Sequence, residues 1–155
     1  MTDYEVRCKH FDELTLRELY EILKARQDVF VVEQNCPYLD MDGKDYDSLH
    51  LFICREDGSV AACLRVFHKP DEPHTAQLGR IVTTERGCGL GRRILHEGVL
   101  TAENVLNAEE LYLEAQQYAI GFYQKEGFAV TSDVFLEDGI PHVEMRKRCL
   151  RQLKE

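Results

Sequence analysis

The sequence predicts an α/β fold built on a mixed β-sheet of about six to seven strands. Strand-like apolar runs alternate along the chain with segments of helical periodicity, which is typical of layered α/β folds. A glycine-rich stretch joins one of these strands to a helix. The 155 residues are enough to bury a core without disulfides or metals. We therefore expect a single domain over residues 1–155.

The first expected elements are a strand and a helix. Apolar and charged residues alternate from Tyr4 to Cys8, which predicts a strand with one buried face. The segment Thr15-Leu16-Arg17-Glu18 is a capping box, whose first and last side chains satisfy free amides at a helix start. The apolar spacing that follows predicts a helix to about Arg26 or Val29.

The later elements follow from apolar runs and turn residues. Asp57-Gly58 between two apolar runs indicates a hairpin, and Gly127 is expected to cap the end of a helix. We expect strands at Leu49–Cys54, Val60–Phe67, Ala76–Thr83, Leu111–Glu114, Phe128–Phe135 and His142–Arg148, a helix from the glycine-rich stretch to about Leu106, a second at Ala115–Glu126, and a surface loop at His68–His74.

The segment Leu39–Asp47 carries four aspartates and superficially suggests a calcium loop. An EF-hand needs an oxygen ligand at its fifth position and glycine at its sixth, but counting from Asp40 these positions hold Lys44 and Asp45. We therefore interpret the segment as a solvated acidic loop. The alternative is that this loop lines the entrance through which an amine substrate reaches the site.

Charge and composition argue against several classes of protein. The formal net charge is −9, which argues against general nucleic-acid binding and is compatible with a cationic amine substrate. No apolar run approaches the ~20 residues of a membrane span, and the N-terminus lacks the apolar core of a signal peptide. We expect a cytoplasmic protein. The six cysteines show no Cys-x-x-Cys and no zinc spacing, so we expect reduced, mostly buried thiols.

The glycine-rich stretch predicts an anion site. Gly87, Gly89 and Gly91 remove three side chains from one turn at a helix start, where free amides and the helix dipole favour an anion. Between Gly79 and His96 there are four arginines and one acid, a local charge of about +3. The arginines are Arg80, Arg86, Arg92 and Arg93.

Spacing separates this loop from two common phosphate loops. A P-loop needs Gly-Lys-Ser/Thr, whereas Gly91 is followed by two arginines. The dinucleotide fingerprint needs a glycine at its sixth position, which holds Arg92 or Ile94 here, depending on the starting glycine. The remaining pattern, Arg86-x-x-Gly89-x-Gly91, resembles the acyl-CoA pyrophosphate loop of the GNAT N-acetyltransferases.

A second motif strengthens this resemblance. Members of the superfamily commonly show Asn-x-x-Ala-x-x-Phe-Tyr-x-Lys-x-Gly-Phe, and the segment from Gln116 to Phe128 matches it except that Gln116 replaces the asparagine. Three further segments resemble the ElaA-like subgroup and extend the match to nearly the whole chain. These are Arg26-x-x-Val29-Phe30-Val31-Val32-Glu33-Gln34-x-Cys36-Pro37-Tyr38, Glu114-Ala115-Gln116 and Phe135-x-Glu137-Asp138-Gly139-Ile140-Pro141-His142.

The resemblance implies the GNAT fold, with helices on both faces of the sheet and a splayed strand pair that binds acetyl-CoA as the acyl donor. The backbone near Val82 would bind the pantetheine and supply a donor for the oxyanion of the tetrahedral intermediate. The residues implied to bind the cofactor are Ile81, Val82, Arg86, Gly87, Cys88, Gly89, Leu90, Gly91, Arg92, Gln116, Ala119, Phe122 and Tyr123.

Acetyl transfer to an amine also needs proton transfer. We expect Tyr123 to protonate the leaving thiolate, because a phenol keeps its proton at neutral pH. The general base is open between Glu33, Glu114 and His142, each of which also has a purely structural interpretation. Deprotonation by water is a further alternative for an amine of low pKa. Cys88 lies in the loop, but a small residue pointing away from the phosphates is the preferred interpretation over a nucleophile.

The sequence therefore predicts an acetyltransferase that acts by direct attack of a small-molecule or peptide amine in a ternary complex, without a metal. The alternatives are a non-catalytic acyl-CoA-binding module and a transferase for a longer acyl group. A homodimer is compatible with the sequence, and neither nucleic acid nor membrane is expected as a partner.

Overall fold

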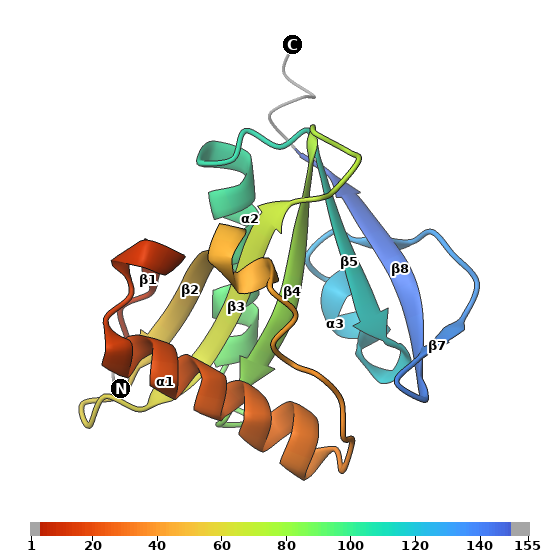
Figure 1. Cartoon of the computed structure of the whole chain (residues 1–155). Helices are drawn as coiled ribbons and strands as arrows, with labels where there is room; N and C mark the ends of the chain where they lie inside the picture. The colour runs from red at the N-terminus through yellow and green to blue at the C-terminus, as the bar shows by residue number, and fades with distance from the viewer. Residues whose placement is uncertain (1–3, 150–155) are drawn as a thin grey trace. The chain divides into compact units, whose positions relative to one another are not determined.

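The computed structural model describes residues 4–149 (Figure 1). These residues form two compact units. Unit 1 contains the described residues up to Val66 together with Arg80–Gly98, and unit 2 contains Phe67–Gly79 together with the described residues from Val99 onward. Eight strands within residues 4–149 are hydrogen-bonded in the order β1-β2-β3-β4-β5-β8-β6, with β7 paired to β8. The predicted mixed sheet is confirmed, with one strand more than expected.

The element order matches the expected alternation of strands and helices. The main elements are β1 (Arg7–His10), α1 (Leu16–Arg26), β2 (Leu49–Cys54), β3 (Val60–His68), β4 (Thr75–Thr83), α2 (Leu90–Asn104), β5 (Glu110–Gln116), α3 (Ile120–Gln124), β6 (Ala129–Val130), β7 (Phe135–Glu137) and β8 (Ile140–Arg148). Short helical segments are η1 (Phe11–Glu13), η2 (Gln27–Glu33), η3 (Lys44–Asp47) and η4 (Gln117–Ala119).

The predicted capping box of α1 is confirmed. The Thr15 hydroxyl accepts a hydrogen bond from Glu18 N at 3.0 Å, and the Glu18 carboxylate accepts one from Thr15 N at 2.9 Å. The α-helix ends at Arg26, as predicted, but the chain continues without a break as the π-helix η2. Such wide turns are rare and are frequently found at functional sites.

The core of unit 1 joins α1 to the strands. Ile22 and Ala25 of α1 belong to one buried cluster with Phe52 of β2 and Cys63 of β3, and Val82 of β4 completes it. Figure 1 shows α1 in front of β2 and β3, with the first turns of α2 behind them. Neighbouring strand residues face opposite sides of a sheet, so both faces of these strands are apolar and covered.

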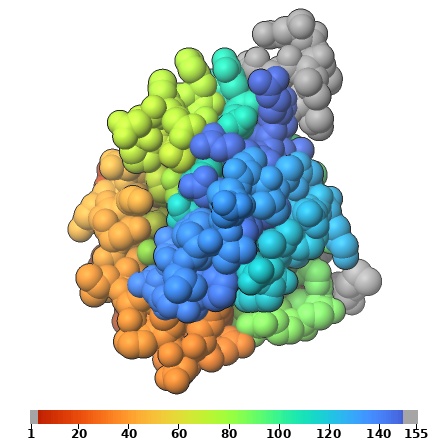
Figure 2. All heavy atoms as spheres, turned by 90° about the vertical axis from the view of Figure 1, so that its right-hand side faces the viewer, coloured from red at the N-terminus to blue at the C-terminus, as the bar shows by residue number. Residues whose placement is uncertain are grey.

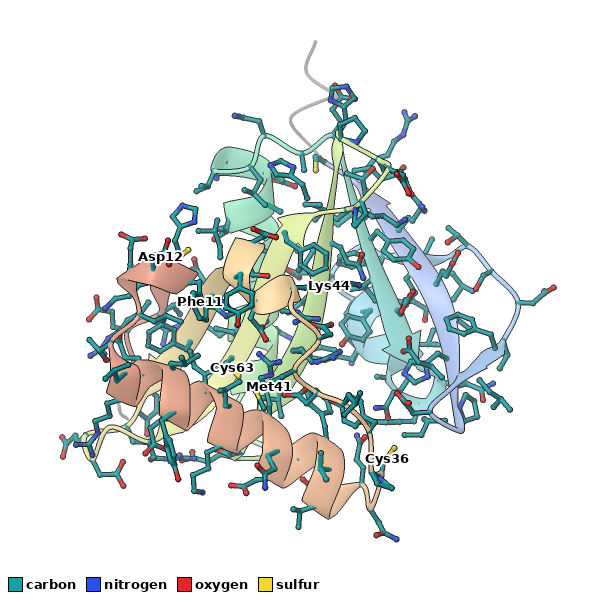
Figure 3. All side chains as sticks on the ribbon, viewed as in Figure 1. Phe11, Asp12, Cys36, Met41, Lys44 and Cys63 are labelled. Atoms are coloured by element: carbon teal, nitrogen blue, oxygen red, sulfur yellow. The ribbon has the colours of Figure 1, made fainter. Side chains whose placement is uncertain are left out.

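Two expectations for unit 1 are wrong in part. The first strand begins at Arg7 rather than Tyr4, and Cys8 is exposed, because this strand lies at the edge of the sheet and pairs only through β2. All six cysteines are free, but only Cys63 and Cys149 are buried, while Cys36 and Cys54 are half-buried and Cys8 and Cys88 are exposed. Cys36 lies well away from Cys63 (Figure 3).

The interpretation of Leu39–Asp47 as a solvated loop holds for most of the segment, including Leu39 and Tyr46, which are 87% and 71% exposed, but it is wrong for Asp45. Asp45 is 8% exposed and accepts hydrogen bonds from two buried guanidinium groups, those of Arg26 at 2.8 Å and Arg65 at 3.1 Å. Asp42 binds Arg65 through both of its carboxylate oxygens, at 2.8 and 2.7 Å. These aspartates neutralise arginines that lie far away in the sequence, and no local pattern signals such pairing. Apolar residues of the same segment, such as Met41, face outward (Figure 3).

In unit 2, β5 and β8 form a seven-residue antiparallel ladder from Glu110↔Arg148 to Gln116↔His142. The helix predicted at Ala115–Glu126 is therefore wrong at its start, because Ala115 and Gln116 still pair with β8. The α-helix itself is only Ile120–Gln124. Its predicted cap is confirmed: Gly127 has φ +100°, and Phe128 N donates to Tyr123 O at 3.2 Å.

The strand predicted at Phe128–Phe135 is wrong, because it is interrupted. Only β6 and β7 are regular, and both pair with the same edge of β8. Asp138 and Gly139 join β7 to β8 and have φ +52° and +76°. Positive φ at both central residues defines a two-residue hairpin turn whose twist matches that of the strands.

Candidate functional site

A glycine loop leads from β4 into α2 in unit 1. Gly87 and Gly89 have φ +80° and +78°, in the left-handed region that side chains disfavour. A Cβ atom at either position would meet no atom within 4 Å, so the space beside the loop is open. The helix begins at Leu90, and Arg93 N donates to Gly89 O at 3.1 Å. Since the first amides of a helix have no carbonyl partner within it, this geometry suits a diphosphate.

Two exposed arginines flank this loop. Arg92 is exposed at the start of α2, and the Arg86 side chain is 65% exposed. The Arg86 guanidinium forms an ion pair with the Glu33 carboxylate of η2, at 2.8 Å. Because both partners are well exposed, this ion pair contributes at most about 1 kcal/mol. A phosphate bound at the loop would compete with Glu33 for Arg86.

One arginine counted with the loop does not belong to it. Arg80 adopts φ +51° within β4, and its Nε atom lies 2.8 Å from Asp40 Oδ1. Its Nη2 atom donates to Asp40 O at 3.0 Å, and the guanidinium carbon lies 5.4 Å from the centre of the Tyr38 ring. The charge of Arg80 is therefore balanced by Asp40, and the positive excess at the loop is smaller than its sequence predicted.

The neighbouring residues of β4 and the loop have distinct environments. Val82 is 3% exposed and packs in the core of unit 1, so only its backbone is available to a ligand. Ile81 is half-buried, and Leu90, 5% exposed, anchors the first turn of α2. The Cys88 side chain is exposed, with its Sγ atom 3.8 Å from the Glu85 carboxylate.

Tyr123, the predicted general acid, lies on α3 in unit 2. Its ring is half-buried and makes edge-to-face contacts with Phe122 and Phe128, at centroid distances of 5.1 and 6.3 Å. Burial raises the pKa of the Tyr123 phenol well above its ordinary value, and the nearby Tyr118 adds to this rise. The phenol therefore stays protonated at neutral pH, as a proton or hydrogen-bond donor must.

The other predicted residues of unit 2 lie close to the end of β5. Gln116 is the last residue of this strand and stands opposite His142 of β8. Ala119 is half-buried in η4, and Phe122 follows in α3. Gln116 thus ends a strand rather than starting a helix. It is also the position at which this chain has glutamine where the family motif has asparagine.

Glu114 stands two residues before Gln116 on the same face of β5. Its carboxylate accepts a hydrogen bond from the Tyr112 hydroxyl at 2.7 Å. His142 is 7% exposed, with its Nε2 atom 3.5 Å from Glu137 Oε2. The three candidates for the base therefore belong to different units. Glu33 lies in unit 1 and pairs with Arg86, whereas Glu114 and His142 lie in unit 2 on one face of the β5–β8 ladder.

Sequence reasoning did not assign a role to Glu137 or Tyr112. A signal for Tyr112 was available, because residues at positions i and i+2 of a strand share a face, and Glu114 is two residues away. Glu137 could not be found in this way, since its approach to His142 depends on the hairpin turn that follows it.

The fold and the glycine loop define an acyl-CoA-dependent acyltransferase, and comparison with known proteins identifies the family. The model of the acetyltransferase (GNAT) domain matches residues 24–149. The chain therefore belongs to the GNAT acetyltransferase family, as its motifs predicted.

Within this family the chain is similar to ElaA and to UPF0039 proteins. It is 36% identical to protein ElaA of Escherichia coli, over 92% of this chain and 95% of that protein, and 38% identical to a UPF0039 protein of Schizosaccharomyces pombe, over 94% and 98%. The crystal structure of Escherichia coli ElaA superposes with a TM-score of 0.87 at 34% identity, covering 94% of this chain and all of that one. An acyl-CoA N-acyltransferase from Pseudomonas aeruginosa matches with a TM-score of 0.87 at 38% identity, covering 94% and 99%.

Two features are absent from residues 4–149. No helix there is long and apolar enough to cross a membrane. Nor does that part of the chain contain three or more histidine, cysteine or acidic side chains arranged to hold a metal ion.

Proposed function

We propose that the protein transfers an acetyl group from acetyl-CoA to a primary amine by direct attack in a ternary complex. The observation that carries this proposal is the open glycine loop, Gly87 to Gly91, at the start of α2. Family membership supports the acyl-CoA donor, and the similarity to an acyl-CoA N-acyltransferase supports nitrogen as the acceptor atom. We propose further that both units act together as one catalytic domain, in keeping with a family match that spans them.

In this proposal the loop residues from Arg86 to Arg92 bind the diphosphate, mainly through backbone amides. The backbone of Ile81 and Val82 binds the pantetheine as an added strand would, and one amide there donates to the oxyanion of the tetrahedral intermediate. The side chains of Gln116, Ala119 and Phe122 would flank the same cofactor. The Tyr123 phenol would donate its proton to the leaving sulfur.

Binding and turnover test this proposal in sequence. Isothermal titration calorimetry with coenzyme A and with acetyl-CoA measures the dissociation constant of each ligand. Thiol release from acetyl-CoA is then followed with spermidine, an N-blocked peptide carrying one lysine, and a short peptide with a free N-terminus. We expect micromolar to millimolar binding and acceleration by at least one amine. Absence of binding to either coenzyme contradicts the proposal.

A longer acyl group is the second candidate, and the similarity to an acyl-CoA N-acyltransferase of Pseudomonas aeruginosa, a class that is not limited to acetyl groups, favours keeping it. Thermal shifts with acetyl-, succinyl- and octanoyl-CoA separate the two, because the tighter ligand at equal concentration raises the melting temperature more. The free state of all six cysteines supports a reducing compartment such as the cytoplasm as the site of the reaction.

A further inference from the structure

Arg80 has a backbone conformation that is foreign to a β-strand. Its φ of +51° lies in the left-handed region, although the residue stands inside β4. This conformation is costly for any residue with a Cβ atom, whereas glycine adopts it freely. Such backbone strain persists only where neighbouring groups hold it, and it is concentrated at functional sites. We therefore looked for the groups that hold Arg80.

The Arg80 side chain is held by the segment that joins η2 to η3. Its Nε atom lies 2.8 Å from Asp40 Oδ1, and its Nη2 atom donates to Asp40 O at 3.0 Å. A longer contact of 3.4 Å joins Nη2 to Asp42 Oδ2. The guanidinium also lies over the ring of Tyr38. A rotation of the Arg80 side chain would break all of these contacts together.

Asp40 is itself fixed from the core of unit 1. Its Oδ2 atom accepts a hydrogen bond from Arg26 Nε at 2.9 Å, and its Oδ1 atom accepts one from the Tyr38 hydroxyl at 2.8 Å. Arg26 is buried where α1 continues into η2. A chain of contacts thus runs from the end of α1 through one carboxylate to β4. Figure 2 shows the segment from η2 to η3 in orange at the surface of the protein.

The pairing of β4 changes close to Arg80. Within residues 4–149, β4 pairs with β5 only over Thr75–Gln77. On the other edge, pairing with β3 extends past the end of β4, because Thr84 N donates to Ala61 O at 2.9 Å. Backbone groups of successive strand residues point to alternate edges, so the amides of Ile81 and Thr83 point away from β3. That edge is the one along which a pantetheine would bind as an added strand.

We propose that Asp40 and Arg80 are positioning residues for acyl transfer. By holding the left-handed conformation of β4, they direct the amides of Ile81 and Thr83 toward the pantetheine and the oxyanion. Neither side chain contacts the reacting atoms in this proposal. The inference rests on the proposed function, and it gives a task to a carboxylate that the sequence placed in a solvated acidic loop.

A held arginine achieves here what glycine would not. Glycine would adopt the same φ without strain, but it would also be free to leave that conformation. The contacts of Arg80 leave the backbone one conformation, and donors that are fixed before a reaction need no reorganisation during it. A displacement of about 1 Å at such donors can lower a rate about 10²-fold, even when the substituted residue is remote from the chemistry.

Asp40→Asn and Arg80→Lys test the inference, with Asp45→Asn as the matched control. Asp45 belongs to the same charge cluster, but its carboxylate binds Arg26 and Arg65. Calorimetry measures the affinity for acetyl-CoA and for adenosine diphosphate, which carries the diphosphate but lacks the pantetheine. We expect both test variants to bind acetyl-CoA about tenfold more weakly, while adenosine diphosphate stays within about twofold. The ratio of the two affinities should not change in Asp45→Asn.

Turnover supplies a second readout that a loss of stability alone would not move. Thiol release is measured with saturating acetyl-CoA and the amine of the panel that reacts fastest, at a temperature where circular dichroism shows every variant folded. We expect kcat to fall about 10–10²-fold in Asp40→Asn and Arg80→Lys and to stay within about twofold in Asp45→Asn. Unchanged kcat values and affinity ratios in both test variants overturn the inference.

Arg80→Gly keeps the inference testable if the other variants unfold. Glycine accepts a φ of +51° but has no guanidinium, so this variant should be more stable than Arg80→Ala and yet have an equally low kcat. Full turnover and an unchanged affinity ratio in Arg80→Gly overturn the inference, because β4 would then need no side-chain contact. If the unchanged protein binds neither acetyl-CoA nor adenosine diphosphate, that different result contradicts the proposed function itself.

Discussion

Buried arginines set the residue-scale chemistry of unit 1. The Arg26 and Arg65 side chains are 1% and 4% exposed, and both contact the Asp45 carboxylate. Removing one partner of such a pair leaves a buried charge uncompensated, which costs far more than the pair itself contributes. Ion pairs therefore help to hold the segment Leu39–Asp47 to the core.

Asp45→Asn should lower the free energy of unfolding by about 1–3 kcal/mol, because two buried guanidinium groups each lose one negative partner, while Arg26 keeps Asp40 and Arg65 keeps Asp42. Urea titration followed by circular dichroism measures this change. Asp28→Asn is the control, since the Asp28 carboxylate is 51% exposed and pairs with Lys24 on the same helical surface. It should cost no more than about 0.5 kcal/mol. Equal losses in the two variants would contradict the buried pairing.

The same carboxylate should make stability depend on acid. Hydrogen bonds and charges from Arg26 and Arg65 lower the pKa of Asp45 from its ordinary value of 3.8 against the effect of burial. A lowered pKa stabilises the fold above pH 3.8 and loses this contribution as the pH falls through the lower folded value. Unfolding midpoints between pH 5 and pH 2 should therefore fall steeply in the unchanged protein and less steeply in Asp45→Asn.

Tyr123→Phe tests the proposed acid with a loss of one hydroxyl group. We expect kcat to fall about 10²–10³-fold while the dissociation constant of acetyl-CoA stays within about threefold, because general acid catalysis is lost and the ring packing is kept. Tyr118→Phe is the control: Tyr118 lies on the same segment but is 79% exposed, so turnover should not change. Unchanged turnover in Tyr123→Phe would remove this residue from the mechanism, and a binding-only module would show no turnover in any variant.

At the scale of elements, the loop between β4 and α2 combines two properties. Positive φ at Gly87 and Gly89 turns the chain sharply, and the absence of Cβ atoms leaves room beside the backbone. Either property alone is common in turns. Their combination at the start of a 15-residue helix creates a place where a diphosphate can approach free amides closely.

Gly89→Ala should separate the effect of backbone strain on stability from the effect of the loop on acetyl-CoA binding. An alanine with φ near +78° costs about 1–2 kcal/mol, and the new methyl group also occupies the space that a phosphate would use. Gly43→Ala is the matched control, because Gly43 has φ +85° and an equally open surrounding. Both variants should lose similar stability, but only Gly89→Ala should weaken acetyl-CoA binding, by tenfold or more in calorimetry. Equal affinities in the two variants would count against the loop as the phosphate site.

At the scale of the whole molecule, the proposed anion site lies in a locally positive segment of a chain whose net charge is −9. If acetyl-CoA binds only the folded protein, about 100 times its dissociation constant should add about 2.7 kcal/mol of stability. For a chain of this size that corresponds to a rise in melting temperature of about 5–10 °C. Differential scanning fluorimetry measures this shift, and adenosine monophosphate, which lacks the diphosphate, is the control ligand.

Most of the fold could be predicted because its signals are local. The capping box at Thr15–Glu18 and the cap at Gly127 each depend on residues a few positions apart. The errors fell where long-range pairing overrides local preference. Ala115 and Gln116 have helical neighbours in the sequence but pair with β8, and the predicted strand at Phe128–Phe135 is divided between β6 and β7.

The sequence by itself determined the family, the glycine loop and the candidate acid, since short motifs carry all three. Only the tertiary structure decided the charge partners: Asp40 binds Arg80, Glu33 binds Arg86, and Glu137 lies beside His142. The physical reason is that motifs reflect local backbone geometry, whereas an ion pair depends on atoms that folding brings within about 3–4 Å.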